Sequence, residues 1–162
     1  MTKNIDMNEA FHNVVDTLDQ RFLHELWLDF EVVSLQHEIL KLKASRDFCY
    51  YHDCAIEFSG VRYFSGQRLW GSDPPVGLTE VLPESDALGM INEYGFETPC
   101  NVIVFNTDAS RKVVIACTSI QLNFNRVYYF AKEKLGLNER IDESVDLPND
   151  KIITQDIGRE PV

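Results

Sequence analysis

No lysine or arginine occurs between Leu69 and Ser110, and this absence is the strongest asymmetry in the sequence. The same stretch, which we call the acidic block, contributes −7 to the net charge of −11. Its acidic residues are Asp73, Glu80, Glu84, Asp86, Glu93, Glu97 and Asp108. Proteins bind nucleic acids and anionic membranes largely by neutralising phosphate charge. We therefore expect so acidic a chain to bind neither DNA, RNA nor a membrane surface.

The sequence also lacks a long hydrophobic run and a leader. No stretch approaches the roughly 20 apolar residues that span a bilayer. The first residues do not combine a basic segment with an apolar one, so we expect no signal peptide. The four cysteines, Cys49, Cys54, Cys100 and Cys117, are then expected to be reduced thiols in a cytoplasmic protein.

Motifs that bind phosphate groups are missing as well. The sequence contains neither G-x-x-x-x-G-K-[ST] nor G-x-G-x-x-G, the glycine-rich loops that surround nucleotide phosphates. We therefore predict no cofactor. A chain of 162 residues with 44% hydrophobic content is long enough to bury one core without metal or disulfide support.

What is present is the periodicity of an α+β domain. Apolar residues recur every three to four positions over residues 7–22, which predicts an amphipathic helix. Alternating or continuous apolar runs predict strands at 27–35, 39–44, 54–64 with an interruption or bulge at Gly60, 101–106, 112–117 and 120–124. Short connections favour antiparallel pairing. We predict a single domain with a mainly antiparallel sheet of about six strands and the N-terminal helix packed on one face.

The remaining segments have weaker patterns. Residues 65–83 contain several glycines and prolines and are predicted to form a long loop, and residues 84–92 a short helix ended by Gly95. Residues 126–135 fit either a second covering helix or a continued strand. We place the domain at residues 1–136 and predict an acidic tail at 137–162. The tail contains scattered apolar residues through which it could dock on the domain.

The densest cluster of reactive side chains is the segment from Cys49 to Cys54. Two thiols and the imidazole of His52 suggest zinc ligands, but zinc prefers about four ligands and this spacing is unusual. A fourth ligand would have to come from Cys117 or His37. A Cys–His nucleophile would need a base within about 3 Å of the thiol. An enzymatic or small-molecule site near Cys49, His52 and Asp53 is therefore an alternative hypothesis, and we predict neither catalytic residues nor a metal.

The acidic block supports the working hypothesis of a non-enzymatic protein that binds a basic protein partner. Aromatic anchors inside a charged rim give an interface both affinity and fast encounter. The predicted partner-binding residues are Trp70, Asp73, Glu80, Glu84, Asp86, Glu93, Tyr94 and Glu97. A further alternative is a homodimer completed by an exposed strand edge or by the tail.

Two segments resemble a known class of proteins. Residues 56–61 (Ile-Glu-Phe-Ser-Gly-Val) and 114–120 (Val-Ile-Ala-Cys-Thr-Ser-Ile) are similar to strands of small uncharacterised bacterial proteins, among them immunity proteins of polymorphic toxin systems. The resemblance extends over about residues 25–125. In those families acidic proteins neutralise basic nuclease toxins by blocking their active sites. The resemblance thus implies an inhibitor of a basic protein.

Overall fold

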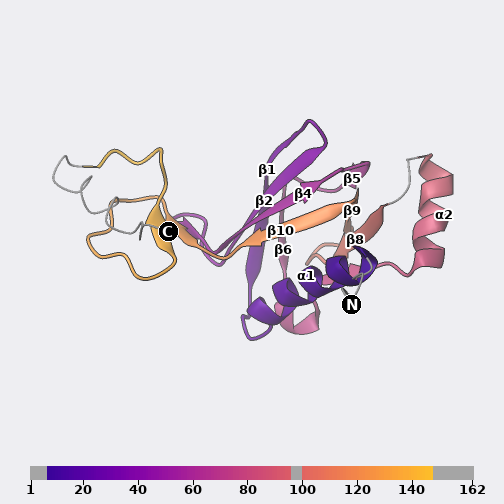
Figure 1. Cartoon of the computed structure of the whole chain (residues 1–162). Helices are drawn as coiled ribbons and strands as arrows, with labels where there is room; N and C mark the ends of the chain where they lie inside the picture. Colours follow the sequence, from indigo (N-terminus) through magenta and orange to yellow (C-terminus); the bar gives the residue numbers. More distant parts are fainter. Residues whose placement is uncertain (1–6, 96–99, 148–162) are drawn as a thin grey trace, which may run out of the picture.

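The computed structural model describes residues 7–95 and 100–147 and has an α+β fold (Figure 1). The predicted class, a single domain with an N-terminal helix, is confirmed. Its elements are α1 (Met7–Phe22), β1 (Leu28–Gln36), β2 (Ile39–Ser45), β3 (Tyr51–His52), β4 (Cys54–Ser59), β5 (Tyr63–Ser65), β6 (Leu69–Ser72), the 3-10 helix η1 (Pro74–Val76), β7 (Thr79–Val81), α2 (Glu84–Tyr94), β8 (Asn101–Phe105), β9 (Val113–Cys117), β10 (Ser119–Asn123), β11 (Arg126–Tyr128) and β12 (Glu139–Ile141).

Two segments far apart in the sequence form one long antiparallel ribbon through the molecule (Figure 1). β3, β4 and β5 follow one another along the chain and pair in turn with β11, β10 and β9. The ribbon bends at Gly60, which has a φ of 62°, and a Cβ added there would lie 2.2 Å from Thr118 Oγ1. Glycine accepts both the conformation and the close approach, so the ribbon can turn from one sheet into the next.

The bent ribbon divides the strands among three sheets instead of one. Their orders are β10-β4-β2-β1-β6, β5-β9-β8-β7 and β12-β11-β3. The first two sheets pack on a shared core in which Phe105 is surrounded by Phe30, Phe58 and Trp70, with ring centroids 5.2 to 6.3 Å away. Aromatic rings bury large apolar areas, so this cluster contributes strongly to the stability of the domain.

Helix α1 closes the gap between β10 of the five-stranded sheet and β7 of the four-stranded sheet. The predicted apolar face of the helix is confirmed, because Phe11, Val15, Leu18 and Phe22 are all buried in the shared core. A polar contact accompanies them: Thr79 Oγ1 on β7 donates a hydrogen bond of 2.8 Å to Asp19 Oδ1.

Asp19 makes the docking of α1 dependent on pH. Burial, with a smaller contribution from Asp16, raises the pKa of Asp19 to about 6 despite the Thr79 hydrogen bond. A raised pKa favours the protonated folded state, so stability falls as pH rises from about 4 through 6. We expect Asp19→Asn, which keeps the acceptor for Thr79, to be more stable than wild type by about 1 kcal/mol at pH 8, a value discounted for partial exposure. Urea titrations of wild type and Asp19→Asn from pH 4 to 8 should give free energies of unfolding that converge at low pH. A difference that stays constant over this pH range would contradict the prediction.

The strands β3, β11 and β12 form a lobe at one end of the molecule, the left end in Figure 1. Of the two alternatives for residues 126–135, a strand is observed over residues 126–128, and no helix forms in this segment. Val127 and Tyr128 are buried, and Tyr128 packs its ring on Tyr51 of β3. Ile141 of β12, within the predicted tail, is also buried. Residues 148–162 of that tail lie outside the described residues.

The prediction of one long loop over residues 65–83 is wrong. β6 pairs with the start of β1, and β7 pairs with β8, so both short strands owe their position to partners distant in the sequence. The predicted short helix is confirmed as α2, and Gly95 ends it with a φ of 69°. Neither helix in the described part of the chain is long and apolar enough to cross a membrane.

Candidate functional site

The structure gathers part of the acidic block on one side of the four-stranded sheet. Glu80 lies on β7, and Glu84, Asp86 and Glu93 lie on α2, which follows β7 directly; all four are exposed. We call these four residues the α2 acidic surface. Tyr94, at the end of α2, is half exposed, and its ring stacks on Tyr63 with centroids 4.8 Å apart.

Among the described residues, no lysine or arginine forms an ion pair with a carboxylate of the α2 acidic surface. Seven ion pairs connect residues of the described ranges 7–95 and 100–147, and none involves a carboxylate from the acidic block. Their acidic members are Glu25, Glu31, Glu38, Asp53, Glu57 and Glu139. The negative field of the block is therefore not compensated locally, whereas much of the charge elsewhere is.

Not every predicted partner-binding residue joins this surface. Trp70 is a core residue that is only 3% exposed and stacks on Phe30, so the prediction that it anchors a partner is wrong. Asp73 is exposed but follows β6, which pairs with β1 in the five-stranded sheet and not with the strands of the four-stranded sheet. Glu97 lies outside the described residues.

The sequence prediction overlooked a different tryptophan next to the acidic block. Trp27 precedes β1 and is 45% exposed, and its ring lies against Gly71 of β6. The alternation of residues 27–31 does indicate that Trp27 is exposed, because Trp27 falls on the same face of the strand as the polar residues Asp29 and Glu31. That position places the indole away from the core.

In the segment from Cys49 to Cys54, the side chains of His52, Asp53 and Cys54 are buried, whereas Cys49 is exposed. His52 is buried, and its Nδ1 lies 2.7 Å from the hydroxyl of Tyr129. Burial, with the charges of Lys43 and Arg140, lowers the pKa of His52 to about 4, so the imidazole is neutral at pH 7. Burial raises the pKa of the Cys54 thiol to about 12. At neutral pH this thiol is therefore protonated and is a poor nucleophile.

These thiols give a simple chemical prediction. Cys49 is exposed and Cys100 half-buried, whereas Cys54 and Cys117 are buried and have pKa values raised by burial to about 12. With a disulfide reagent at pH 8, we expect Cys49 to react rapidly, Cys100 slowly, and the two buried thiols only after unfolding. Mass spectrometry of partly labelled protein measures this order. Rapid labelling of Cys54 in the folded protein would contradict it.

Asp53, in the same segment, is the centre of a charged cluster. Its Oδ1 accepts hydrogen bonds from Arg126 Nε at 3.0 Å and from Arg46 Nη2 at 3.1 Å, and its Oδ2 accepts one from the backbone N–H of Arg46. Arg46 also pairs with Glu25, and the Arg126 guanidinium lies over the Tyr51 ring. Since Arg126 belongs to the lobe and Arg46 follows β2, this Asp53 cluster fastens the lobe to the main sheets.

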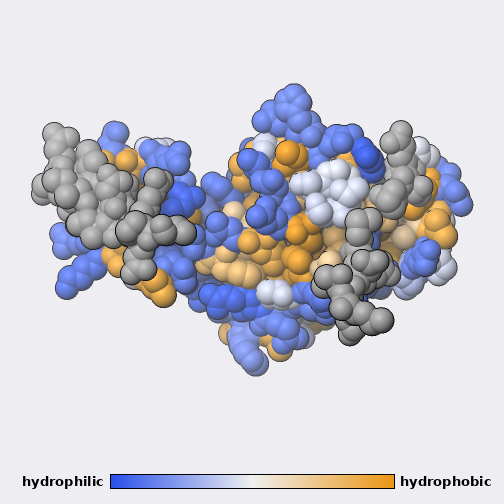
Figure 2. Space-filling view, viewed as in Figure 1, coloured by the Kyte–Doolittle hydropathy of each residue, from blue (hydrophilic) through white to orange (hydrophobic). Residues whose placement is uncertain are grey.

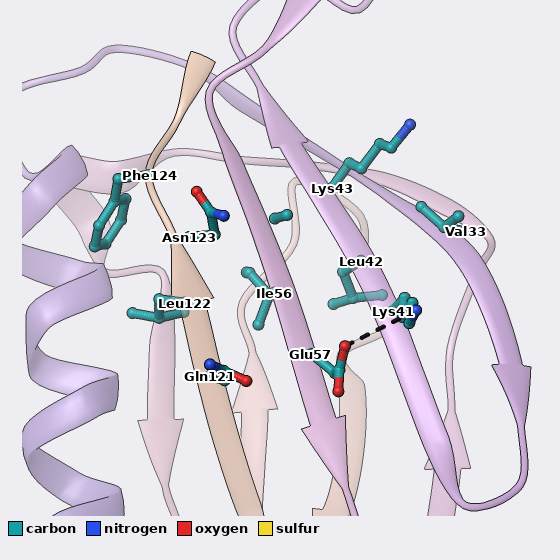
Figure 3. A pocket seen from close by; sticks show the side chains of 11 residues that line it. Val33, Lys41, Leu42, Lys43, Ile56, Glu57, Gln121, Leu122, Asn123 and Phe124 are labelled. Atoms are coloured by element: carbon teal, nitrogen blue, oxygen red, sulfur yellow. Dashed lines mark ion pairs between the residues drawn. The ribbon is translucent and has the colours of Figure 1, made fainter. Parts of the chain in front are cut away.

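A hollow of about 520 Å³ lies on the solvent-facing side of the five-stranded sheet. Figure 3 shows Lys41 and Glu57 joined by an ion pair of 3.9 Å there, with Gln121 and Asn123 on the neighbouring strand. Apolar surface follows β10 above α1 in the space-filling view (Figure 2). Because its positive and negative charges stand side by side, the hollow has no strong preference for a charged ligand.

The described residues contain no group of three or more His, Cys, Asp or Glu side chains that could hold a metal ion. The residues weighed above as possible zinc ligands, Cys49, His52 and Cys54, do not form such a group. The sequence matches no protein-family model, and no similar protein is found among curated proteins or solved structures.

Proposed function

We propose that this protein is a non-enzymatic binding protein that engages a basic protein partner through the α2 acidic surface. The observation that carries the proposal is that Glu80, Glu84, Asp86 and Glu93 are exposed and none forms an ion pair with a described residue. An uncompensated field of one sign attracts a partner of the opposite sign and accelerates its association.

Apolar groups next to these carboxylates supply the contact area that charge alone does not. Leu88 on the outer side of α2 is 45% exposed, and Tyr94 is 51% exposed. Exposed aromatic and aliphatic side chains within a charged rim serve as anchors in protein interfaces. The stacking of Tyr94 on Tyr63 holds its ring in place before binding, which reduces the entropy lost on association.

An inhibitory role follows from the resemblance to immunity proteins, and the partner class would then be a basic nuclease. The alternative of an enzyme at Cys49–Cys54 is less well supported, because His52 is a neutral buried group and the Cys54 thiol stays protonated at neutral pH. The cluster around Asp53 has an adequate structural role in joining the lobe to the sheets.

The experiment is a capture from native lysate at low salt on immobilised full-length protein. A variant with Glu80, Glu84 and Glu93 changed to Lys serves as the test. A variant with Asp16, Glu143 and Asp146 changed to Lys has the same total charge and alters exposed carboxylates elsewhere. We expect wild type and the second variant to retain the same basic protein and the first variant to lose it. Equal retention by all three would refute the proposal.

A further inference from the structure

Trp27 and Asp108 meet on the backbone of Gly71, although they are distant in the sequence. A Cβ added to Gly71 would lie 2.7 Å from Cη2 and 2.8 Å from Cζ2 of Trp27, and 3.0 Å from Asp108 Oδ2. The backbone N–H of Asp108 donates a hydrogen bond of 2.9 Å to the Gly71 carbonyl, which fixes the hairpin end beside β6. The absent side chain of Gly71 therefore leaves space for an indole edge and a carboxylate side by side.

Both groups are accessible and available. Trp27 is 45% exposed, Asp108 is exposed, and no ion pair or side-chain hydrogen bond within residues 7–95 and 100–147 reaches the Asp108 carboxylate. Asp73 follows Gly71 by two residues in extended backbone, so its side chain projects from the same face. An exposed aromatic ring thus lies next to acidic side chains.

An aromatic ring next to a carboxylate favours a planar cation as its ligand. Asp108 Oδ2 and the edge of the Trp27 ring approach the same point on Gly71, so a cation paired with this carboxylate would lie close to the indole. An aromatic ring attracts a cation that lies over its face within about 6 Å of the ring centroid. A guanidinium group stacks on aromatic faces and donates paired hydrogen bonds to a carboxylate, whereas an ammonium group acts as a compact point charge.

We infer that Trp27, Asp108 and Gly71 form a binding site for an arginine side chain of the basic partner. The inference rests on the proposed function and extends it, because it names the side chain of the partner that this protein recognises. It also separates two contributions. The α2 acidic surface attracts the partner over distance, and the site at Gly71 recognises one residue of it on contact.

The test is a titration of the full chain with acetyl-arginine amide at constant ionic strength, followed through its two indole N–H signals by NMR. Trp70 is buried and serves as the internal reference, while Trp27 is the reporter. Acetyl-citrulline amide has nearly the same shape without the charge. We expect a saturable shift of the Trp27 signal with arginine, no such shift with citrulline, and a stationary Trp70 signal.

Three variants test whether the arginine derivative binds at the site formed by Trp27, Gly71 and Asp108. Asp108→Asn should weaken the arginine affinity by about two- to fivefold, the loss expected for one exposed charge pair. Gly71→Ala should weaken it similarly, because its Cβ displaces both Trp27 and Asp108 while the Trp70 signal reports an intact core. Glu143→Gln, an exposed carboxylate in the lobe, should have no effect.

An equal response to citrulline, or an unchanged affinity in Asp108→Asn, would overturn the inference. The proposed function would survive that result if charge reversal on α2 still abolished partner capture. Conversely, a specific arginine response without any captured partner would support the site and remove the proposed function.

Discussion

Replacing Asp53 by alanine should destabilise the protein by about 3 to 4 kcal/mol, the loss typical of removing one partner from a buried ion pair. Asp53 is 7% exposed and accepts hydrogen bonds from two arginines. Its removal leaves the guanidinium groups of Arg46 and Arg126 next to each other without their common carboxylate. Because these arginines belong to the two parts that Asp53 joins, the lobe should separate first. Urea unfolding followed by circular dichroism measures the total loss.

The control is Asp53→Asn, which keeps the shape and an acceptor but removes the charge, and it should lose less stability than alanine. Burial opposes ionisation of Asp53, but the hydrogen bonds and charges of Arg46 and Arg126 bring its pKa below 3.8. A lowered pKa stabilises the folded state above pH 3.8, and this contribution disappears as pH falls further. The difference between wild type and Asp53→Asn should therefore shrink in acid. If Asp53→Ala lowered the free energy of unfolding by less than about 1 kcal/mol at pH 7, the prediction would be wrong and the cluster would behave as a surface ion pair.

Charge reversal on the α2 acidic surface should have the largest effect on binding. Changing Glu80, Glu84 and Glu93 to Lys should raise the Kd for the captured partner about 100-fold at low salt. Three exposed charge pairs at about 1 kcal/mol each account for about 3 kcal/mol, and each 1.4 kcal/mol is a factor of ten. Isothermal titration calorimetry with the purified partner measures this change.

The matched control for this prediction is the variant with lysines at positions 16, 143 and 146, which has the same net charge. We expect its Kd to change less than that of the α2 variant at low salt, and to lie within about threefold of wild type at physiological ionic strength. There the Debye length is about 8 Å, so charges farther than this from the interface are screened. Equal losses in the two variants would show that net charge, not the α2 acidic surface, governs the interaction. The unfolding curves of both variants should remain close to wild type, since all six positions are exposed.

Local periodicity predicted the parts of the fold that depend on local sequence. Residues 7–22 repeat apolar side chains at helical spacing, and β2 and β4 alternate, so their buried faces were predicted correctly. β6 and β7 are three or four residues long and are held by pairing with β1 and β8. Such short strands have no period of their own, and the glycines and prolines around them masked their presence.

Local sequence also predicted which carboxylates of the acidic block are exposed, because the exposure of charged side chains is nearly independent of the fold. Their role in binding stays a prediction. The choice between Trp70 and Trp27 as anchor depended on tertiary contacts. Trp70 stacks on Phe30 and meets Phe105 in the core, whereas Trp27 remains outside against Gly71. The resemblance to immunity proteins leaves this choice open.

The most direct test of the binding account is the salt dependence of the association rate with the captured partner. Stopped-flow measurements would follow wild type, the α2 charge-reversal variant and the matched control from low to physiological ionic strength. We predict that the rate constant of wild type and control falls about tenfold or more over this range, as steered association does. The α2 variant should associate slowly with little salt dependence. The same steep salt dependence in all three proteins would contradict the claim that the α2 acidic surface attracts the partner.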